Sequence, residues 1–157
     1  MRSFPRLTAL FGAPVDALDE SAIQSAIDSR IPEDVDLDWK EAHYPKDKNP
    51  ELAKDVAQLA NTMGGIIVLG IKEQDGCADA PNPVPLGDNQ ERRIREVVSA
   101  RIRPFLPGVS FRSIETSADM GYLVIVVPQS ADAPHAVVQE WRAGVRSARW
   151  LEDAMAI

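Results

Sequence analysis

The chain of 157 residues is long enough for one domain with its own core, and 45% hydrophobic with 26% charged residues is the composition of a globular protein. This composition excludes collagen-like, disordered and membrane-embedded classes, while a net charge of −7 means that any nucleic-acid contact requires a local basic patch. The only cysteine, Cys77, leaves no partner for an intramolecular disulfide or for a zinc site built from cysteines.

Residues 1–17 are predicted to form an irregular N-terminal arm, because Pro5, Gly12 and Pro14 interrupt any regular element. The start is basic, but the apolar run after it is broken by the first proline and the glycine, so we expect no signal peptide and a cytoplasmic protein. Residues 18–157 are expected to form a single domain.

A short amphipathic helix is predicted after the arm. Asp19 is a typical N-cap residue, and Ile23, Ala26 and Ile27 recur at the spacing of one helical face. Pro32 is expected to end this element.

The segment 34–40 alternates between apolar and charged residues. In an extended strand, Val35, Leu37 and Trp39 face the core. The opposite face then carries Asp34, Asp36, Asp38 and Lys40. A solvated edge strand explains this pattern, and so does a row of carboxylates screened by a lysine or a cation, and both interpretations stay open.

A second helix is predicted from the sequence Asn49-Pro50-Glu51, which places a proline and an acidic residue in the first turn. Apolar residues at helical spacing continue from Leu52 to Met63. The helix is expected to end at Gly64.

A buried strand follows directly. Residues 66–71 are apolar or glycine without alternation, which predicts a central strand covered on both faces. Asn61, Gly64 and Gly65 are expected to form a backbone turn before it, whose free space admits a ligand phosphate or a neighbouring part of the chain. We interpret this turn as mainly architectural.

A third helix is predicted between Asp88, as its N-cap, and Pro104. Arg92, Arg95 and Arg103 fall on the side opposite its apolar stripe and form the densest basic cluster of the chain. A solvated face with salt bridges and a phosphate-binding surface are its two interpretations.

Two strands, at residues 109–115 and 122–127, are predicted to form a hairpin. In the tail, arginines alternate with Trp141 and Trp150, which suits stacking on bases as well as simple packing. The order of elements predicts an α/β (α+β) fold, with a mixed sheet of about five to six strands flanked by two to three helices.

Several blocks of the sequence occur in the order found in a known family. They are Glu33-x4-Asp38-Trp39-Lys40, Ala60-Asn61-Thr62-x-Gly64-Gly65, Val68-Leu69-Gly70-Ile71, Val124-Ile125-Val126-Val127-Pro128, Pro134-His135 and Trp141-Arg142-x-Gly144. Over roughly residues 25 to 150 the chain thereby resembles the Schlafen-type Alba-like domain. That family carries the label of a DNA-binding domain, and bacterial members are also labelled divergent ATPase-like proteins or predicted transcriptional regulators.

The resemblance implies a mixed α/β fold and, from the animal members, a metal-assisted ribonuclease site of three acidic side chains. By motif position these are Glu33, Asp38 and a third residue after the central strand, for which Glu73 matches best and Asp75 is the alternative. Such carboxylates bind Mg²⁺ or Mn²⁺, which stabilises charge on a phosphoryl oxygen and activates water.

The predicted function is therefore a nucleic-acid-associated binding module for RNA or DNA. Its predicted contact residues are Lys40, Arg92, Arg95, Arg103 and Arg142. The alternatives are a metal-dependent endoribonuclease and a non-catalytic protein-interaction or homodimerisation domain, which the acidic net charge favours over free nucleic-acid binding. Many bacterial relatives carry this domain ahead of further domains, so further domains or a protein partner are also expected. Binding of ATP at the glycine turn is a further alternative, although the sequence contains no G-x-x-x-x-G-K-[ST] loop. No membrane partner is expected.

Overall fold

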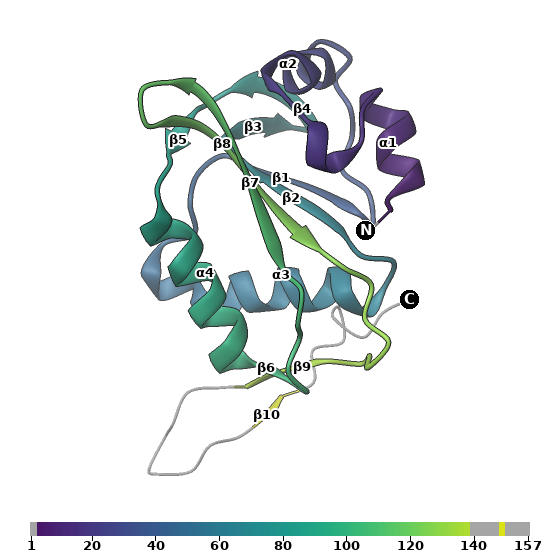
Figure 1. The fold of residues 1–157 in the computed structure, drawn as a ribbon, viewed down its shortest axis with the longest axis vertical. Coiled ribbons are helices and arrows are strands. Elements are labelled where there is room, and N and C mark those ends of the chain that lie inside the picture. The colour runs from purple at the N-terminus through teal and green to yellow at the C-terminus, as the bar shows by residue number, and fades with distance from the viewer. Residues whose placement is uncertain (1–2, 139–147, 150–157) are drawn as a thin grey trace. The chain divides into compact units, whose positions relative to one another are not determined.

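The computed structural model describes residues 3–138 and 148–149, and the chain divides into two compact units (Figure 1). The first, called the sheet unit below, comprises Met1–His43, Gly65–Gly87 and Ser110–Val126. The second, called the helix unit, comprises Tyr44–Gly64, Asp88–Val109 and Val127–Ile157.

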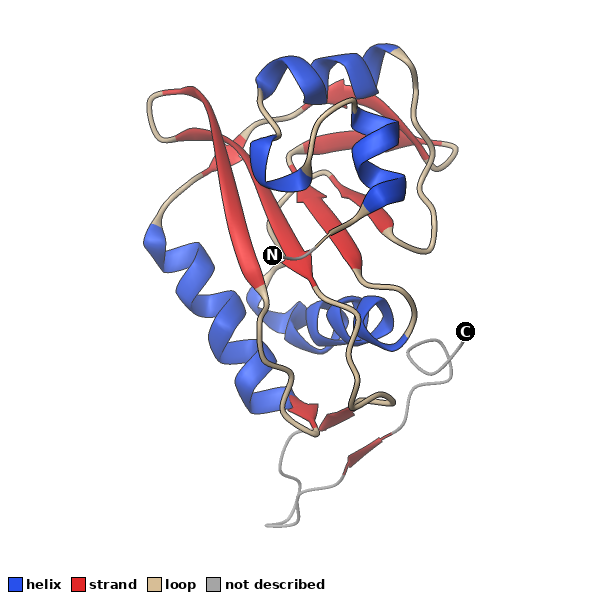
Figure 2. Cartoon of the chain, turned by 45° about the vertical axis from the view of Figure 1, so that its right-hand side comes forward, coloured by secondary structure: helices blue, strands red, loops and turns tan. Residues whose placement is uncertain are grey.

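The sheet unit contains two α-helices, a short 3-10 helix and most of the strands that the structure describes (Figure 2). Its helical elements are α1 (Pro5–Phe11), η1 (Val15–Ala17) and α2 (Glu20–Asp28). Its strands are β1 (Leu37–Lys40), β2 (Gly65–Leu69), β3 (Ile71–Gln74), β4 (Cys77–Pro81), β5 (Val84–Pro85), β7 (Ser110–Ser117) and β8 (Met120–Val127).

The main sheet has five strands in the order β1-β2-β8-β5, with β7 also paired to β8. Strands β1 and β2 are parallel and pair from Leu37 with Ile66 to Lys40 with Leu69, whereas β5 and β7 run antiparallel to β8. The predicted mixed sheet and the hairpin of β7 and β8 are thus confirmed. Strands β3 and β4 form a separate antiparallel pair.

The core of the sheet unit forms where α1 and α2 pack on the sheet. Leu7 and Phe11 of α1 belong to one buried cluster with Trp39 and Val68, and the rings of Phe11 and Trp39 meet edge to face at 6.2 Å. Trp39 is 1% exposed and its indole N–H donates to the Ile31 carbonyl at 2.9 Å, so the polar atom of this large side chain is satisfied. All residues of β2 are buried, as predicted for a strand covered on both faces.

Two expectations about the N-terminal part are wrong. The arm is not irregular, because Pro5 occupies the first helical turn of α1 and Gly12 ends the helix with φ +71°. Strand β1 begins only at Leu37, since Asp34 and Leu37 exchange backbone hydrogen bonds of 3.0 and 3.1 Å in a turn. Val35 lies in this turn and is 59% exposed, not in the core.

The helix unit is built on two helices and a small sheet. Its elements are η2 (Lys46–Lys48), α3 (Asn49–Asn61), α4 (Asp88–Arg101), β6 (Ile102–Arg103), β9 (Ala136–Val138) and β10 (Ala148–Arg149). Helix α3 packs on α4 and β9, and the three strands pair in the order β10-β9-β6. Across the part of the chain that is described, no helix has the length and apolar character needed to cross a membrane.

Candidate functional site

The predicted backbone turn begins with a buried asparagine. The side chain of Asn61, which is 7% exposed, accepts the His135 backbone N–H at 2.7 Å and donates to the His135 carbonyl at 3.2 Å. The amide thus pairs with the backbone as a neighbouring strand would, and its substitution by an aliphatic residue leaves two buried groups unpaired. Asn61 therefore connects the end of α3 to the start of β9.

The two glycines of the turn are required by close backbone contacts. Gly64 has φ +73°, and a Cβ atom there would lie 2.6 Å from the backbone nitrogen of Gln129. A Cβ atom on Gly65 would lie 2.2 Å from the carbonyl oxygen of Asp36. The space that glycine leaves at both positions is thus filled by the chain's own backbone, which agrees with an architectural role for the turn.

A buried histidine extends the network around the turn. His135 is fully buried, and its Nδ1 lies 2.8 Å from the Pro104 carbonyl oxygen while its Nε2 lies 2.7 Å from Oγ of Ser130. Because a carbonyl oxygen only accepts, Nδ1 carries a proton and donates to Pro104. The ring therefore fixes the backbone just after β6.

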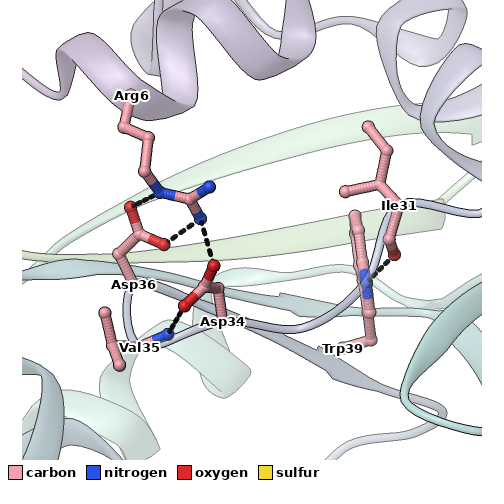
Figure 3. Close-up of polar contacts among 6 residues, drawn as sticks. All are labelled: Arg6, Ile31, Asp34, Val35, Asp36 and Trp39. Carbon is pink, nitrogen blue, oxygen red and sulfur yellow. Dashed lines mark hydrogen bonds and ion pairs between the residues drawn. The ribbon is translucent and has the colours of Figure 1, made fainter.

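An arginine of α1 pairs with the acidic segment before β1 (Figure 3). Arg6 on α1 donates from Nε and Nη2 to the two carboxylate oxygens of Asp36, and the Nε contact measures 2.8 Å. Asp36 is 2% exposed, and Asp34 lies 3.6 Å from the same guanidinium. The hydrogen bond to Asp36 and the two nearby carboxylates raise the pKa of Arg6 above its ordinary value, against a smaller opposing effect of burial.

The three predicted catalytic carboxylates all lie in the sheet unit, each in a different setting. Glu33 accepts the backbone N–H of Trp39 at 3.2 Å, and Oδ2 of Asp38 lies 3.4 Å from Nζ of Lys40. Glu73 is exposed on β3. The contact between Asp38 and Lys40 places these two side chains together, as the strand pattern predicts.

Within residues 3–138 and 148–149, no three His, Cys, Asp or Glu side chains gather in a group that could hold a metal ion. Glu33, Asp38 and Glu73 are therefore not gathered into one group in this structure, and Glu33 accepts a backbone donor of β1. Their catalytic role stays a prediction.

Charge is distributed unevenly between the units. In residues 3–138, the sheet unit carries five Lys and Arg against fourteen Asp and Glu, whereas the helix unit carries eight against seven. The acidity of the whole chain thus belongs mainly to the sheet unit. A polyanion meets far less repulsion at the helix unit.

Arg93 on α4, which no local sequence signal indicates, connects α4 to the segment that precedes α3. Its Nη1 donates to the Tyr44 carbonyl at 2.5 Å, and its Nη2 donates to the Pro45 carbonyl at 2.9 Å and to Oδ1 of Asn49 at 2.8 Å. These contacts hold the chain that enters η2 and α3 against α4. The exposed Lys46 and Lys48 of η2 follow directly in sequence and are thereby tied to the arginine-bearing helix.

The other predicted cationic residues differ in their surroundings. Arg92 and Arg95 are exposed on α4. Arg103 is exposed as well, but its Nη1 donates to the carbonyls of Ser99 and Ile102 at 2.6 and 2.8 Å, so it also caps the end of α4. Arg142 lies outside the described residues.

The sheet unit also has a hollow of about 1040 Å³ between α1, η1 and β7. Its lining is largely apolar, with Phe4, Val15 and Phe111, and it includes Arg112, whose Nε donates to the Leu18 carbonyl at 2.6 Å. None of the predicted catalytic, metal-binding or nucleic-acid-binding residues within the described part of the chain lines this hollow.

The fold resembles known structures. The N-terminal domain of a protein from Nitrosomonas europaea, named as related to the ATP-dependent DNA helicase RecG, matches with a TM-score of 0.52 and 18% identity over 69% of this chain and 73% of that one. The DIP2311 protein from Corynebacterium diphtheriae matches with a TM-score of 0.48 and 22% identity over 84% of this chain and 28% of that one.

A search among curated proteins found no match. The family model described as "Schlafen, AlbA_2" matches residues 33–149, which is well over half of the sequence. The chain therefore belongs to the Schlafen AlbA_2 family.

Proposed function

We propose that the chain is a nucleic-acid-associated binding module that holds the phosphate backbone of RNA or DNA on the helix unit. The observation that carries this proposal is the Arg93 contact set, which fixes η2 with Lys46 and Lys48 against the helix that bears Arg92 and Arg95. Lysine and arginine side chains bind phosphates mainly through charge, so several of them in one unit provide affinity without sequence preference.

Two further findings support the proposal. The family model and the relation of one structural neighbour to a DNA helicase both point to nucleic acid as the partner. The acidic sheet unit disfavours the alternative placement of the contact around Lys40, whose Nζ lies 3.4 Å from Asp38. The helix unit is consequently the better docking surface.

The test is a fluorescence-anisotropy titration of the full chain with a labelled oligonucleotide at several salt concentrations. Replacing Arg92 and Arg95 together by alanine removes two phosphate contacts, so the slope of log K against log salt is expected to fall by about 1.4–1.8 and the affinity by about tenfold. Lys72→Ala is the matched control, because Lys72 is an exposed cation of the sheet unit.

Equal losses in the double variant and in the Lys72 variant would place the contact elsewhere. Binding that does not change with salt, or no binding at all, would rule out a phosphate-binding module.

A further inference from the structure

We propose that Phe105 is a stacking platform for an unpaired base, so that the helix unit binds single-stranded in preference to double-stranded nucleic acid. This inference rests on the proposed function and specifies its substrate class. Phe105 is 57% exposed and, among the large hydrophobic side chains that are exposed in the described residues, it is the aromatic one. Single exposed apolar residues are common, so the proposal depends on the residues around Phe105.

The backbone on both sides of Phe105 is fixed. The Pro104 carbonyl accepts the hydrogen bond from the fully buried His135, and Leu106 is 2% exposed in the core of the helix unit. The ring is thus exposed to solvent on a backbone segment that is already ordered. This lowers the loss of conformational entropy when a base stacks on the ring.

Cations stand beside this ring in the sequence. Arg103 is exposed two residues earlier, and its guanidinium is held at the end of α4 by the carbonyls of Ser99 and Ile102. The same helix carries Arg92 and Arg95 further from this end.

An exposed aromatic face close in sequence to an exposed arginine suits a single strand, because in a duplex the π-faces of each base are covered by the stacked neighbouring base pairs. The ligand is therefore a flexible polyanion with accessible bases. RNA and single-stranded DNA both have these two properties.

The experiment uses the full chain and three labelled probes of equal length: a DNA strand and an RNA strand, each with one 2-aminopurine, and a DNA duplex. Phe105→Leu keeps apolar area but removes the π-face, and Phe105→Trp keeps it. Met63→Ala is the matched control, since Met63 is 45% exposed in the same unit. Circular dichroism verifies the fold of each variant.

We expect quenching of 2-aminopurine on binding to the wild type, an approximately tenfold loss of single-strand affinity in Phe105→Leu, and recovery in Phe105→Trp. Duplex affinity should stay within about twofold of the wild type. The DNA and RNA strands then show which sugar is preferred.

Unchanged single-strand affinity in Phe105→Leu would overturn the stacking inference and leave the phosphate-binding module intact. The stacking inference also fails if single-strand and duplex affinities fall equally, because the ring would then act through something other than an unpaired base. A wild type that binds none of the three probes would overturn both proposals, and would direct attention to Phe105 as a contact for a protein.

Discussion

Replacing Arg6 by methionine and by alanine tests how Asp36 is tolerated in the interior. Asp36 is 2% exposed, and its carboxylate accepts both of its described hydrogen bonds from the guanidinium of Arg6, whose own side chain is 41% exposed. Arg6 thus neutralises the carboxylate and also separates it from water. The two substitutions remove the same charge but differ in whether Asp36 becomes hydrated.

Methionine reaches about as far as the Nε of arginine, so it keeps Asp36 more covered than alanine does while donating no hydrogen bond. An uncompensated buried charge costs about 3–5 kcal/mol, and we expect the lower end, about 3 kcal/mol, because the site is partly open. Alanine exposes Asp36 to water, which replaces the lost donors, so about 1 kcal/mol is expected. If loss of apolar contact alone determined stability, Arg6→Met would be the more stable variant, since methionine retains more contact than alanine.

The free energy of unfolding is measured by urea titration at pH 7 with circular dichroism at 222 nm as the signal. Arg30→Met is the control, because Arg30 pairs with Asp79 at 2.6 Å while both side chains are well exposed, at 48% and 35%. That variant should lose less than about 1 kcal/mol. If Arg6→Met is at least as stable as Arg6→Ala, Asp36 is not a desolvated charge and the reasoning fails.

Two further predictions concern the fold. Gly64→Ala should lower the free energy of unfolding by at least about 2–3 kcal/mol, because it adds a Cβ atom 2.6 Å from a backbone nitrogen at a residue with positive φ. Gly76→Ala should lower it by only about 1 kcal/mol, because Gly76 has φ +77° but nothing within 4 Å of the added atom. Thermal melting of the two variants measures the difference. Burial, with a smaller effect of the Glu20 charge, raises the pKa of Tyr122, so the wild type should lose stability as pH rises above the unfolded value of about 10. In Tyr122→Phe, the free energy of unfolding should fall less between pH 8 and pH 11, as measured by urea titration, because the variant has no phenol to ionise at this position. A wild type and a Phe variant with the same pH dependence would contradict the assignment.

Local sequence signals predict an element correctly where its burial and its caps depend on residues close by in the sequence. The unbroken apolar run of β2 predicts burial on both faces, and every residue of the strand is buried. Asp19 accepts the Ala22 backbone N–H at 2.8 Å, as its position before α2 predicts. In both cases neighbours within a few residues determine the outcome.

The same signals fail where a distant residue supplies the partner. Alternation places Asp36 with the solvent-facing acids, but it is buried because Arg6, thirty positions earlier in the chain, pairs with it. Pro5 and Gly12 resemble breakers of regular structure, although a proline in a first turn and a glycine after a last turn also bound a helix. A seven-residue helix offers too little periodicity to decide between these meanings.

Two other features escape sequence-based prediction for different reasons. Asp75-Gly76 lies in the turn between β3 and β4, and both residues have positive φ, which is the preferred hairpin chemistry. The polar residues after Ile71 conceal the strand β3 that precedes this turn. Arg93 gives no local signal, because its acceptors are mainly backbone carbonyls near Tyr44, which a sequence pattern does not display.

The residues predicted for catalysis lie in the sheet unit together with Lys40, whereas the arginines of α4 that are predicted for binding lie in the helix unit. Glu33, Asp38 and Glu73 belong to the sheet unit, whereas Arg92 and Arg95 belong to the helix unit. At physiological ionic strength charges act over about 8 Å, so a polyanion responds to the unit that it approaches and not to the sum over the chain. An excess of nine carboxylates in the described sheet unit repels it, and the helix unit does not. The proposed polyanion binding therefore rests on the helix unit, whatever role the carboxylates of the sheet unit have.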